Sequence, residues 1–333
     1  MFLREINIKN YFERIGKMAK TKIQPSVQKS APYLKVISKL KTWQVENGYV
    51  ADAELMSPHI QRPDNWGVLD ANNNYNKMVE FQRLQWDPVN FLKSTSTIHP
   101  AFVVNNQRSR IFLGEDPASF ATSLGFDQQL AACAQLNNGA DITGFHQMTN
   151  AEWAMLAYSK NRPINGIIGS VWQRVGGMKI VDGEIQIIPD NDAADYLVDQ
   201  SLGSKAYKAI LQSGKLVKPG TKGTLKINHE GNISIVSKES GWQSKWFKNI
   251  ECTINVDPLS PGVALLQSLG LCPSHDTDIP NGGRFYFNTR GEFVPLRGGY
   301  WNNGADDGVF ALKLSDTRAY ASWFVGLRLA FKL

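Results

Sequence analysis

The C-terminal segment restricts the fold of this chain more than any other part of the sequence, because it combines glycines with spaced apolar residues. The apolar residues are Trp301, Val309, Phe310, Leu312 and Leu314, and glycines stand at 298, 299, 304, 308 and 326. Glycine allows backbone turns that other residues resist. We therefore expect a long loop followed by strands, with Trp301 and Phe310 as buried anchors. Residues 324–333 alternate in a way that predicts a final strand.

The side chains between these anchors are aromatic or small and polar. They are Tyr300, Asn302, Asn303, Asp306, Asp307, Lys313, Ser315, Asp316, Tyr320, Ser322 and Phe324. This mixture is favoured on adaptable binding surfaces, although a decorated surface loop has the same composition. We expect Tyr300 and Tyr320 to be exposed. We also expect Tyr300, Asp306, Tyr320 and Phe324 to converge on one patch.

Two helices are predicted upstream of this segment. Residues 116–135 have apolar residues at helical spacing. Thr149 stands three residues before Glu152 and begins a second helix, which fits a capping box with Thr149 as the N-cap.

The middle of the chain changes from helical to strand periodicity. Asp182-Gly183 interrupts two apolar runs and predicts a hairpin. A second hairpin is predicted around residues 229–232. A helix with a loop through Gly203 is predicted over 190–213. Residues 33–115 are rich in turn signals and read as a small domain that is mostly β or irregular.

Composition excludes several classes of protein. The chain has 333 residues, of which 42% are hydrophobic and 20% charged, so it is not a disordered chain. It contains no apolar run of 18 residues and no signal-peptide pattern at its start, so we expect a soluble protein without membrane insertion. The three cysteines, Cys133, Cys252 and Cys272, are widely spaced and suggest neither a disulfide framework nor a zinc site.

The positive net charge belongs to the first part of the chain. Residues 1–42 carry ten basic and two acidic side chains, so the rest of the chain contributes −2 to the total of +6. A basic arm can hold phosphate, but a nearly neutral folded part does not favour nucleic acid as a partner.

No metal or catalytic motif stands out. The five histidines are scattered, and no P-loop, GxSxG, HExxH or GxGxxG pattern is present. Residues 274–278 (Ser-His-Asp-Thr-Asp) resemble a ligand cluster, but a turn explains them equally well. Asp190, Asp192 and Asp195 could face calcium, and helix capping is the favoured interpretation. We expect no cofactor and no metal.

The end of the chain resembles a known family. The residues RGGYWNNG (297–304), GVFAL (308–312) and WFVGLR (323–328) resemble the C-terminal signature of C-type-lectin-fold proteins of the formylglycine-generating-enzyme type. Within that group they are similar to variable proteins diversified by retroelements, such as phage tail-fibre receptor-binding proteins. The helix start at residues 148–154 and the hairpin at 182–189 fit the same fold. The resemblance covers about residues 116–333.

The resemblance implies an α+β C-type lectin fold with a smaller N-terminal domain. It divides the chain into a basic helix and linker (1–32), an attachment domain (33–115) and the lectin-fold domain (116–333). That domain would carry a hairpin and helix insertion at about 178–255 and a variable region at about 297–328. In the family, adenines of AAC codons are mutagenised. Tyr, Asp, Ser and Phe are products of this change, Asn302 and Asn303 fit an unmutated codon, and Lys313 is not reachable.

The implied function is recognition rather than catalysis. The partners would be a host cell-surface protein or glycan and other phage tail proteins, in a monomer or a homotrimer. The protein would lie in the virion after cytoplasmic synthesis, or in the cytoplasm if it is not a phage protein. The cysteine pair of the catalytic family members and the calcium-site motifs of animal lectins are missing. A structural tail or baseplate subunit and a relative of the oxidases are the alternatives.

Overall fold

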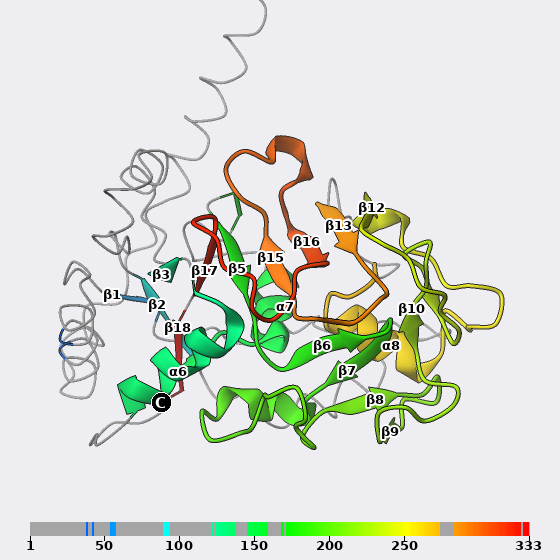
Figure 1. Cartoon of the computed structure of the whole chain (residues 1–333), viewed down its shortest axis with the longest axis horizontal. Coiled ribbons are helices and arrows are strands. Elements are labelled where there is room, and N and C mark those ends of the chain that lie inside the picture. Colours follow the sequence, from blue (N-terminus) through cyan, green and yellow to red (C-terminus); the bar gives the residue numbers. More distant parts are fainter. Residues whose placement is uncertain are drawn as a thin grey trace, which may run out of the picture.

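The fold is α+β, with far more strand than helix. The computed structural model describes residues 38, 42, 54–57, 89–93, 121–122, 124–137, 145–158, 168–169, 171–273, 283–327 and 329–332. Figure 1 labels the α-helices α6 (Phe126–Asn137), α7 (Asn150–Tyr158) and α8 (Pro261–Ser268). Three 3₁₀ helices cover Pro189–Ala194, Phe247–Asn249 and Gly304–Asp306.

The first of three sheets joins early and late parts of the chain. Its order is β1 (Glu54–Ser57), β2 (Val89–Lys93), β18 (Leu329–Lys332) and β4 (Phe145–Gln147). All its pairings are antiparallel. The last strand of the chain therefore pairs with a strand from the segment 33–115.

The second sheet is built from short hairpins. Its order is β11 (Ile233–Ser234), β10 (Lys226–Ile227), β7 (Glu184–Ile187), β6 (Met178–Val181) and β14 (Glu292–Phe293). Strand β8 (Lys208–Ile210) pairs with β7 and with β9 (Leu216–Val217). Both predicted hairpins are confirmed, at β6–β7 and at β10–β11.

The third sheet carries the C-terminal loops. Its order is β12 (Gln243–Trp246), β13 (Arg284–Phe287), β16 (Gly308–Leu314), β15 (Leu296–Gly298), β5 (Trp172–Arg174), β17 (Val325–Leu327) and β3 (Ala121–Thr122). The pairs β13–β16 and β5–β17 are parallel. Parallel neighbours need long connections, and other strands lie between the two members of each of these pairs in the chain.

The main core lies on one face of the third sheet. Phe285 and Phe287 of β13 and Leu312 of β16 join the side chains of α7, α8 and the second sheet in one buried cluster. Because strand side chains alternate, Tyr286 of β13 and Ala311 of β16 point to the opposite face, where a smaller cluster forms. The sheet thus separates a core from a second, outer face.

Three expectations need correction. Residues 121–122 form β3, so the helix predicted from 116 begins at Phe126. The helix predicted over 190–213 is wrong: after the 3₁₀ helix the chain turns and enters β8, since Asp190 and Asn191 have left-handed backbones (φ 57°) that stop a helix. The final strand is split into β17 and β18, which belong to different sheets.

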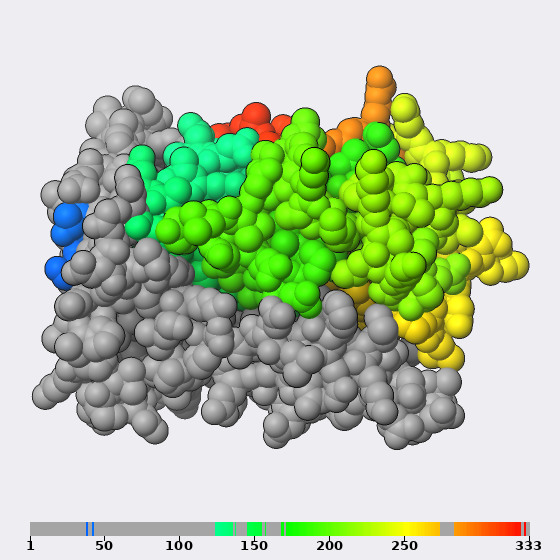
Figure 2. Space-filling model, turned by 90° about the horizontal axis from the view of Figure 1, so that it is seen from below, coloured from blue at the N-terminus to red at the C-terminus, as the bar shows by residue number. Residues whose placement is uncertain are grey.

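The C-terminal loops lie at one side of the molecule. The β15–β16 loop projects beyond its strands at the top of Figure 1 (orange). Figure 2, seen from below, shows a broad face formed by the green and light-green residues that follow β6, with red and orange residues only at its edge. In the described part of the chain, no helix combines the length and the apolar character that crossing a bilayer requires.

Candidate binding surface

The outer face of the third sheet carries a cluster of aromatic side chains on two loops. Trp172, Leu296, Ala311 and Val325 form its buried floor, against which Tyr300, Tyr320, Phe324 and Tyr286 pack partly buried. Tyr300 comes from the β15–β16 loop (residues 299–307). Tyr320 and Phe324 come from the β16–β17 loop (residues 315–324). Two segments that are separate in sequence therefore meet over one sheet face.

The rings of these loops form a continuous group. We call Tyr300, Trp301, Tyr320, Trp323 and Phe324 the aromatic cluster. Tyr300 stacks on Phe324 with a centroid distance of 4.8 Å, and Tyr320 lies 6.3 Å from Phe324. Trp323 lies edge-on to Phe324 at 5.3 Å and 6.2 Å from Trp301. Such offset and edge contacts are favourable between aromatic rings, so the rings support one another.

The expected division into buried anchors and exposed rings holds only in part. Phe310 is 4% exposed and stacks on Phe247 at 5.3 Å, as expected of an anchor. Trp301 is 37% exposed, so the expectation that it is buried is wrong. Its ring lies in the loop beside Tyr300 and Trp323 instead of entering the core. Tyr300 and Tyr320 are half-buried rather than exposed.

The polar residues predicted for this surface fall into two groups. Near the β15–β16 loop, Asp306 accepts a hydrogen bond from the Tyr286 hydroxyl (3.1 Å), and Asn302 is exposed. Near the β16–β17 loop, Lys313 pairs with Asp316 at 2.8 Å and lies 5.7 Å from the centre of the Tyr320 ring.

The remaining predicted residues lie within the same two loops or beside them. Asn303, Asp307, Ser315 and Ser322 are all half-buried. Of the four residues expected to converge, Tyr300, Tyr320 and Phe324 share one cluster, and Asp306 reaches it through Tyr286.

Asp307 sits in the most restrictive environment of the surface. Burial raises the pKa of its carboxyl to about 7; the Asn303 side chain and the Tyr300 backbone lower the pKa, and Asp306 raises it. A Cβ at Gly169 would lie 3.0 Å from its Oδ2, and a Cβ at Gly299 would overlap its Oδ1. Both glycines also have positive φ, so only glycine fits there.

Several backbone atoms of the β16–β17 loop are held by hydrogen bonds from other parts of the fold. Buried Arg174 donates from Nη2 to the carbonyl oxygens of Thr317 (3.0 Å) and Tyr320 (2.5 Å). The Phe126 amide donates to the Arg318 carbonyl (2.9 Å), and the Trp172 amide donates to the Phe324 carbonyl (2.8 Å). The pKa of Arg174 is lowered by burial to about 10, which leaves it charged at neutral pH. Carbonyl contacts of this kind survive a change of side chain.

One side chain of this loop faces inward and acts as a brace. Arg318 pairs with Asp127 of α6 at 2.6 Å and with Glu292 of β14 at 3.4 Å. It also donates to the Gln200 carbonyl at 2.6 Å. Glu292 in turn pairs with Lys179 of β6 at 3.1 Å. This network ties the loop to α6, to β14 and to the segment around Gln200.

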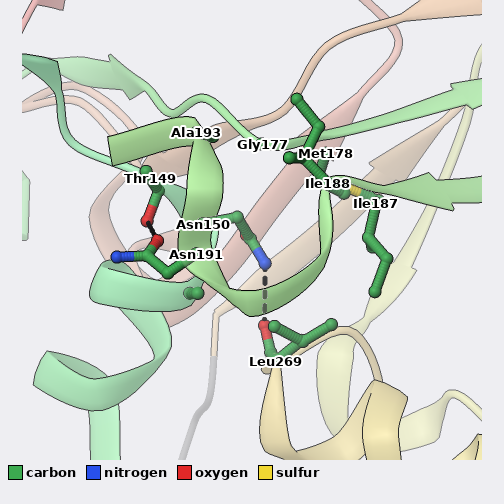
Figure 3. Close-up of a pocket in the computed structure, with 10 residues that line it drawn as sticks. Thr149, Asn150, Gly177, Met178, Ile187, Ile188, Asn191, Ala193 and Leu269 are labelled. Carbon is green, nitrogen blue, oxygen red and sulfur yellow. Dashed lines mark hydrogen bonds between the residues drawn. The ribbon is translucent and has the colours of Figure 1, made fainter. Parts of the chain in front are cut away.

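A buried arginine fixes the start of the other loop. Arg297, the last residue before Gly298-Gly299, donates to the Asn150 side-chain oxygen from Nε and Nη2 (3.0 and 2.7 Å). Its Nη2 also donates to the Gly270 carbonyl (3.0 Å), at the end of α8. Figure 3 shows the Asn150 amide donating to the Leu269 carbonyl as well, at 3.0 Å.

The small pocket in Figure 3 lies behind this junction. It is lined by the start of α7, by β6 and β7 and by Asn191, to which Thr149 donates a hydrogen bond of 2.6 Å. The capping box is confirmed: the Glu152 amide donates to Thr149 Oγ1 (3.1 Å), and the Thr149 amide donates to Glu152 Oε2 (2.9 Å). The residues around this pocket hold the start of α7, and the pocket itself is far too narrow for a sugar or a peptide.

The described part of the chain contains neither a metal-ligand cluster nor a disulfide bond. No group of three His, Cys, Asp or Glu side chains there is arranged to hold a metal ion. The cluster at residues 274–278 lies outside the described residues. All three cysteines are free, and burial raises the pKa of each thiol, for Cys252 to about 11. Thiolates, the reactive form, are therefore disfavoured.

Sequence reasoning missed the neighbours of this surface on β12 and β13. Trp242, Tyr286 and Arg284 are about 15 to 60 residues away in the chain, beyond the glycine-rich segment. The one available signal was the two tryptophans within residues 242–246. Their contacts with Tyr286 and Arg284, which in turn meet Asp306, depend on the pairing of β12 with β13, which the sequence does not display.

Neither the protein-family models nor the curated proteins that were searched contain a match to this chain. The interpretation of the surface therefore depends on its geometry and on the sequence motif.

Proposed function

We propose that this chain is a receptor-binding protein that recognises a host cell-surface molecule through the aromatic cluster. One observation carries the proposal: partly exposed aromatic rings stand on two loops whose backbones are fixed by buried residues. A rigid platform of aromatic side chains binds at low entropic cost, because little is ordered on association. Rings of this kind supply most of the binding energy in many interfaces.

The backbone contacts also support a surface whose side chains are exchangeable. The β16–β17 loop keeps its path through the carbonyls of residues 317, 318, 320 and 324. Substitution of Tyr320, Ser322 or Phe324 leaves those contacts in place. Diversification by a retroelement requires such tolerance, because many sequences must share one fold.

Together with the C-terminal motif, this supports a C-type lectin fold of the formylglycine-generating type. We propose that the protein is the tip adhesin of a phage or prophage tail fibre, and that another tail protein holds its N-terminal part. A gene for a reverse transcriptase close to this one, with an Asn-rich near-copy of codons 297–328, is the genomic signature expected. Absence of both contradicts diversification, though not binding.

Cell binding tests the proposal directly. Fluorescently labelled protein is incubated with a panel of bacterial strains, and retention is measured by flow cytometry for the wild type and for Tyr320→Ala and Phe324→Ala. We expect at least one strain to retain the wild type and each substitution to weaken retention about thirtyfold, as for a central anchor. Leu202→Ala, which changes a 62% exposed residue that lies outside both loops, is the control.

Two results contradict the proposal. Retention by none of the strains excludes adhesion to their surfaces. Equal retention of the wild type and both loop variants places the binding site elsewhere. Either result, combined with stable incorporation into assembled tails, favours a structural subunit.

A further inference from the structure

A second aromatic group continues the proposed binding surface beyond the C-terminal segment. Trp242 is 63% exposed and stacks on Tyr286, with a centroid distance of 5.9 Å and an angle of 29° between the rings. Tyr286 packs edge-on against Trp172 at 6.0 Å, in the cluster that also contains Tyr300 and Phe324. The exposed indole therefore adjoins the floor beneath the aromatic cluster.

Strand β13 carries Tyr286 and Arg284 of this second group, and Trp242 directly precedes β12. Strand β12 pairs with β13 so that Ser244 lies opposite Tyr286 and Trp246 opposite Arg284. Arg284 donates to Ser244 Oγ at 3.1 and 3.2 Å, and its guanidinium lies 5.1 Å from the centre of the Trp246 ring. A paired strand fixes its side chains more firmly than a loop does.

The second group is joined to the β15–β16 loop by polar contacts. The Tyr286 hydroxyl donates to Asp306 Oδ2 at 3.1 Å, and Arg284 Nη1 lies 4.0 Å from Asp306 Oδ1. The strands thus position a residue of the segment 297–328. Tyr286, on which Trp242 stacks, therefore also contacts this carboxylate.

The charges of the surface indicate what kind of ligand fits. Asp306 faces Arg284, and Asp316 pairs with Lys313. An ionic ligand would have to compete with these pairs, whereas an uncharged ligand can share their remaining donors and acceptors. A sugar ring presents an apolar face of C–H groups and a rim of hydroxyls. The face can pack on an indole, and the hydroxyls can bond to the carboxylate and guanidinium.

We infer that Trp242, Tyr286 and Arg284 form a fixed part of the binding surface, and that the ligand is an uncharged glycan. The inference rests on the proposed function and narrows its partner to one chemical class. Residues of the loops would then select among sugars, while Trp242 supplies a stacking platform common to all variants of the segment 297–328.

Immobilised neutral polysaccharides test the inference. The probes are mannan, galactan, a β-1,3-glucan and N-acetylglucosamine oligomers, and binding of the full chain is measured by biolayer interferometry. We expect at least one probe to bind the wild type, and Trp242→Ala to weaken that binding at least tenfold. Trp242→Phe, which keeps a ring, should lose less. Leu202→Ala is the control, because Leu202 is about as exposed as Trp242. This variant should bind like the wild type.

Several outcomes overturn the inference. If the wild type binds none of the neutral probes, the ligand is not one of these glycans and the inference is contradicted. If Trp242→Ala and Leu202→Ala bind with equal affinity, Trp242 is not part of the binding surface. Trp242→Ala must melt near the temperature of the wild type, so that a loss of binding does not reflect unfolding. If the alanine variant unfolds, Trp242→Phe is measured in its place.

Treatment of cells separates this inference from the proposed function. Periodate cleaves the vicinal diols of sugars, whereas protease removes surface proteins. On a strain that retains the chain, loss of binding after periodate but not after protease supports the glycan. Loss after protease alone, with dependence on Tyr320, leaves the adhesin in place and contradicts the glycan.

Discussion

Arg297 and Asn150 are joined by two hydrogen bonds, of 2.7 and 3.0 Å, that run from one guanidinium to one amide oxygen. Asn150 begins α7 and Arg297 is the middle residue of β15, so the pair links residues that are 147 apart in sequence. Arg297 also meets carbonyls at the end of α8, where the helix dipole favours a cation. The glycines that open the β15–β16 loop follow directly. The path of the loop therefore starts from a buried, fully constrained residue.

This relationship predicts that Asn150→Ala destabilises the fold more than the loss of an exposed polar side chain does. The buried guanidinium would lose its side-chain acceptor, at a cost of about 1–3 kcal/mol. The measurement is urea unfolding monitored by circular dichroism. Asn302→Ala, at an exposed residue of the same loop, should change the free energy of unfolding by no more than about 0.5 kcal/mol. Equal effects of the two substitutions would contradict the role of Asn150.

Substitution of a buried anchor should reduce the stability of the fold more than substitution of an exposed ring. Phe310→Ala empties a core site beside Phe247 and should cost about 3–5 kcal/mol. Trp301→Ala removes a 37% exposed ring and should cost about 1 kcal/mol or less. Thermal melts of the two variants check the order, and a larger loss for Trp301→Ala would refute it.

Asp307 predicts a pH dependence of stability. Its pKa in the folded protein, about 7, is higher than the value of about 3.9 for a free aspartate. The folded state thus prefers the protonated carboxyl, so stability falls as pH rises from about 4 to about 7 and stays low above that. Asp307→Asn should therefore raise the melting temperature at pH 8 and have little effect at pH 4.

The control is Asn302→Ala, at an exposed residue of the same loop that carries no titratable group. Its melting temperature should depend on pH as that of the wild type does. A profile of Asp307→Asn that runs parallel to that of the wild type would show that this carboxyl ionises normally.

The cysteines should be slow to react in the folded protein. Cys252 is half-buried, whereas Cys133 and Cys272 are buried, so a disulfide reagent at pH 8 should modify Cys252 first. Unfolding in urea should make all three react quickly. Replacement of Cys252 by Ser should leave binding unchanged, because the aromatic cluster contains no cysteine. Rapid reaction of Cys133 or Cys272 in the native state would contradict their burial.

Local sequence determined the elements whose signals are complete within a few residues. The capping box at Thr149 and Glu152 and the hairpin at Asp182-Gly183 are both present as predicted. Each depends on contacts between neighbours in the chain, so short patterns suffice. The same is true of Phe310, which lies among apolar residues of one strand. The aromatic and small polar side chains of the C-terminal segment were also visible from composition.

Tertiary structure decided which residues share a face. Trp301 is exposed although it resembles an anchor, because the loop after Gly299 carries it away from the core. Residues 190–213 lack an α-helix because two left-handed residues redirect the chain. Trp242 and Asp306 adjoin Tyr286 only through strand pairing and a long connection. Contacts between distant residues depend on the packing of whole sheets, which no local pattern records.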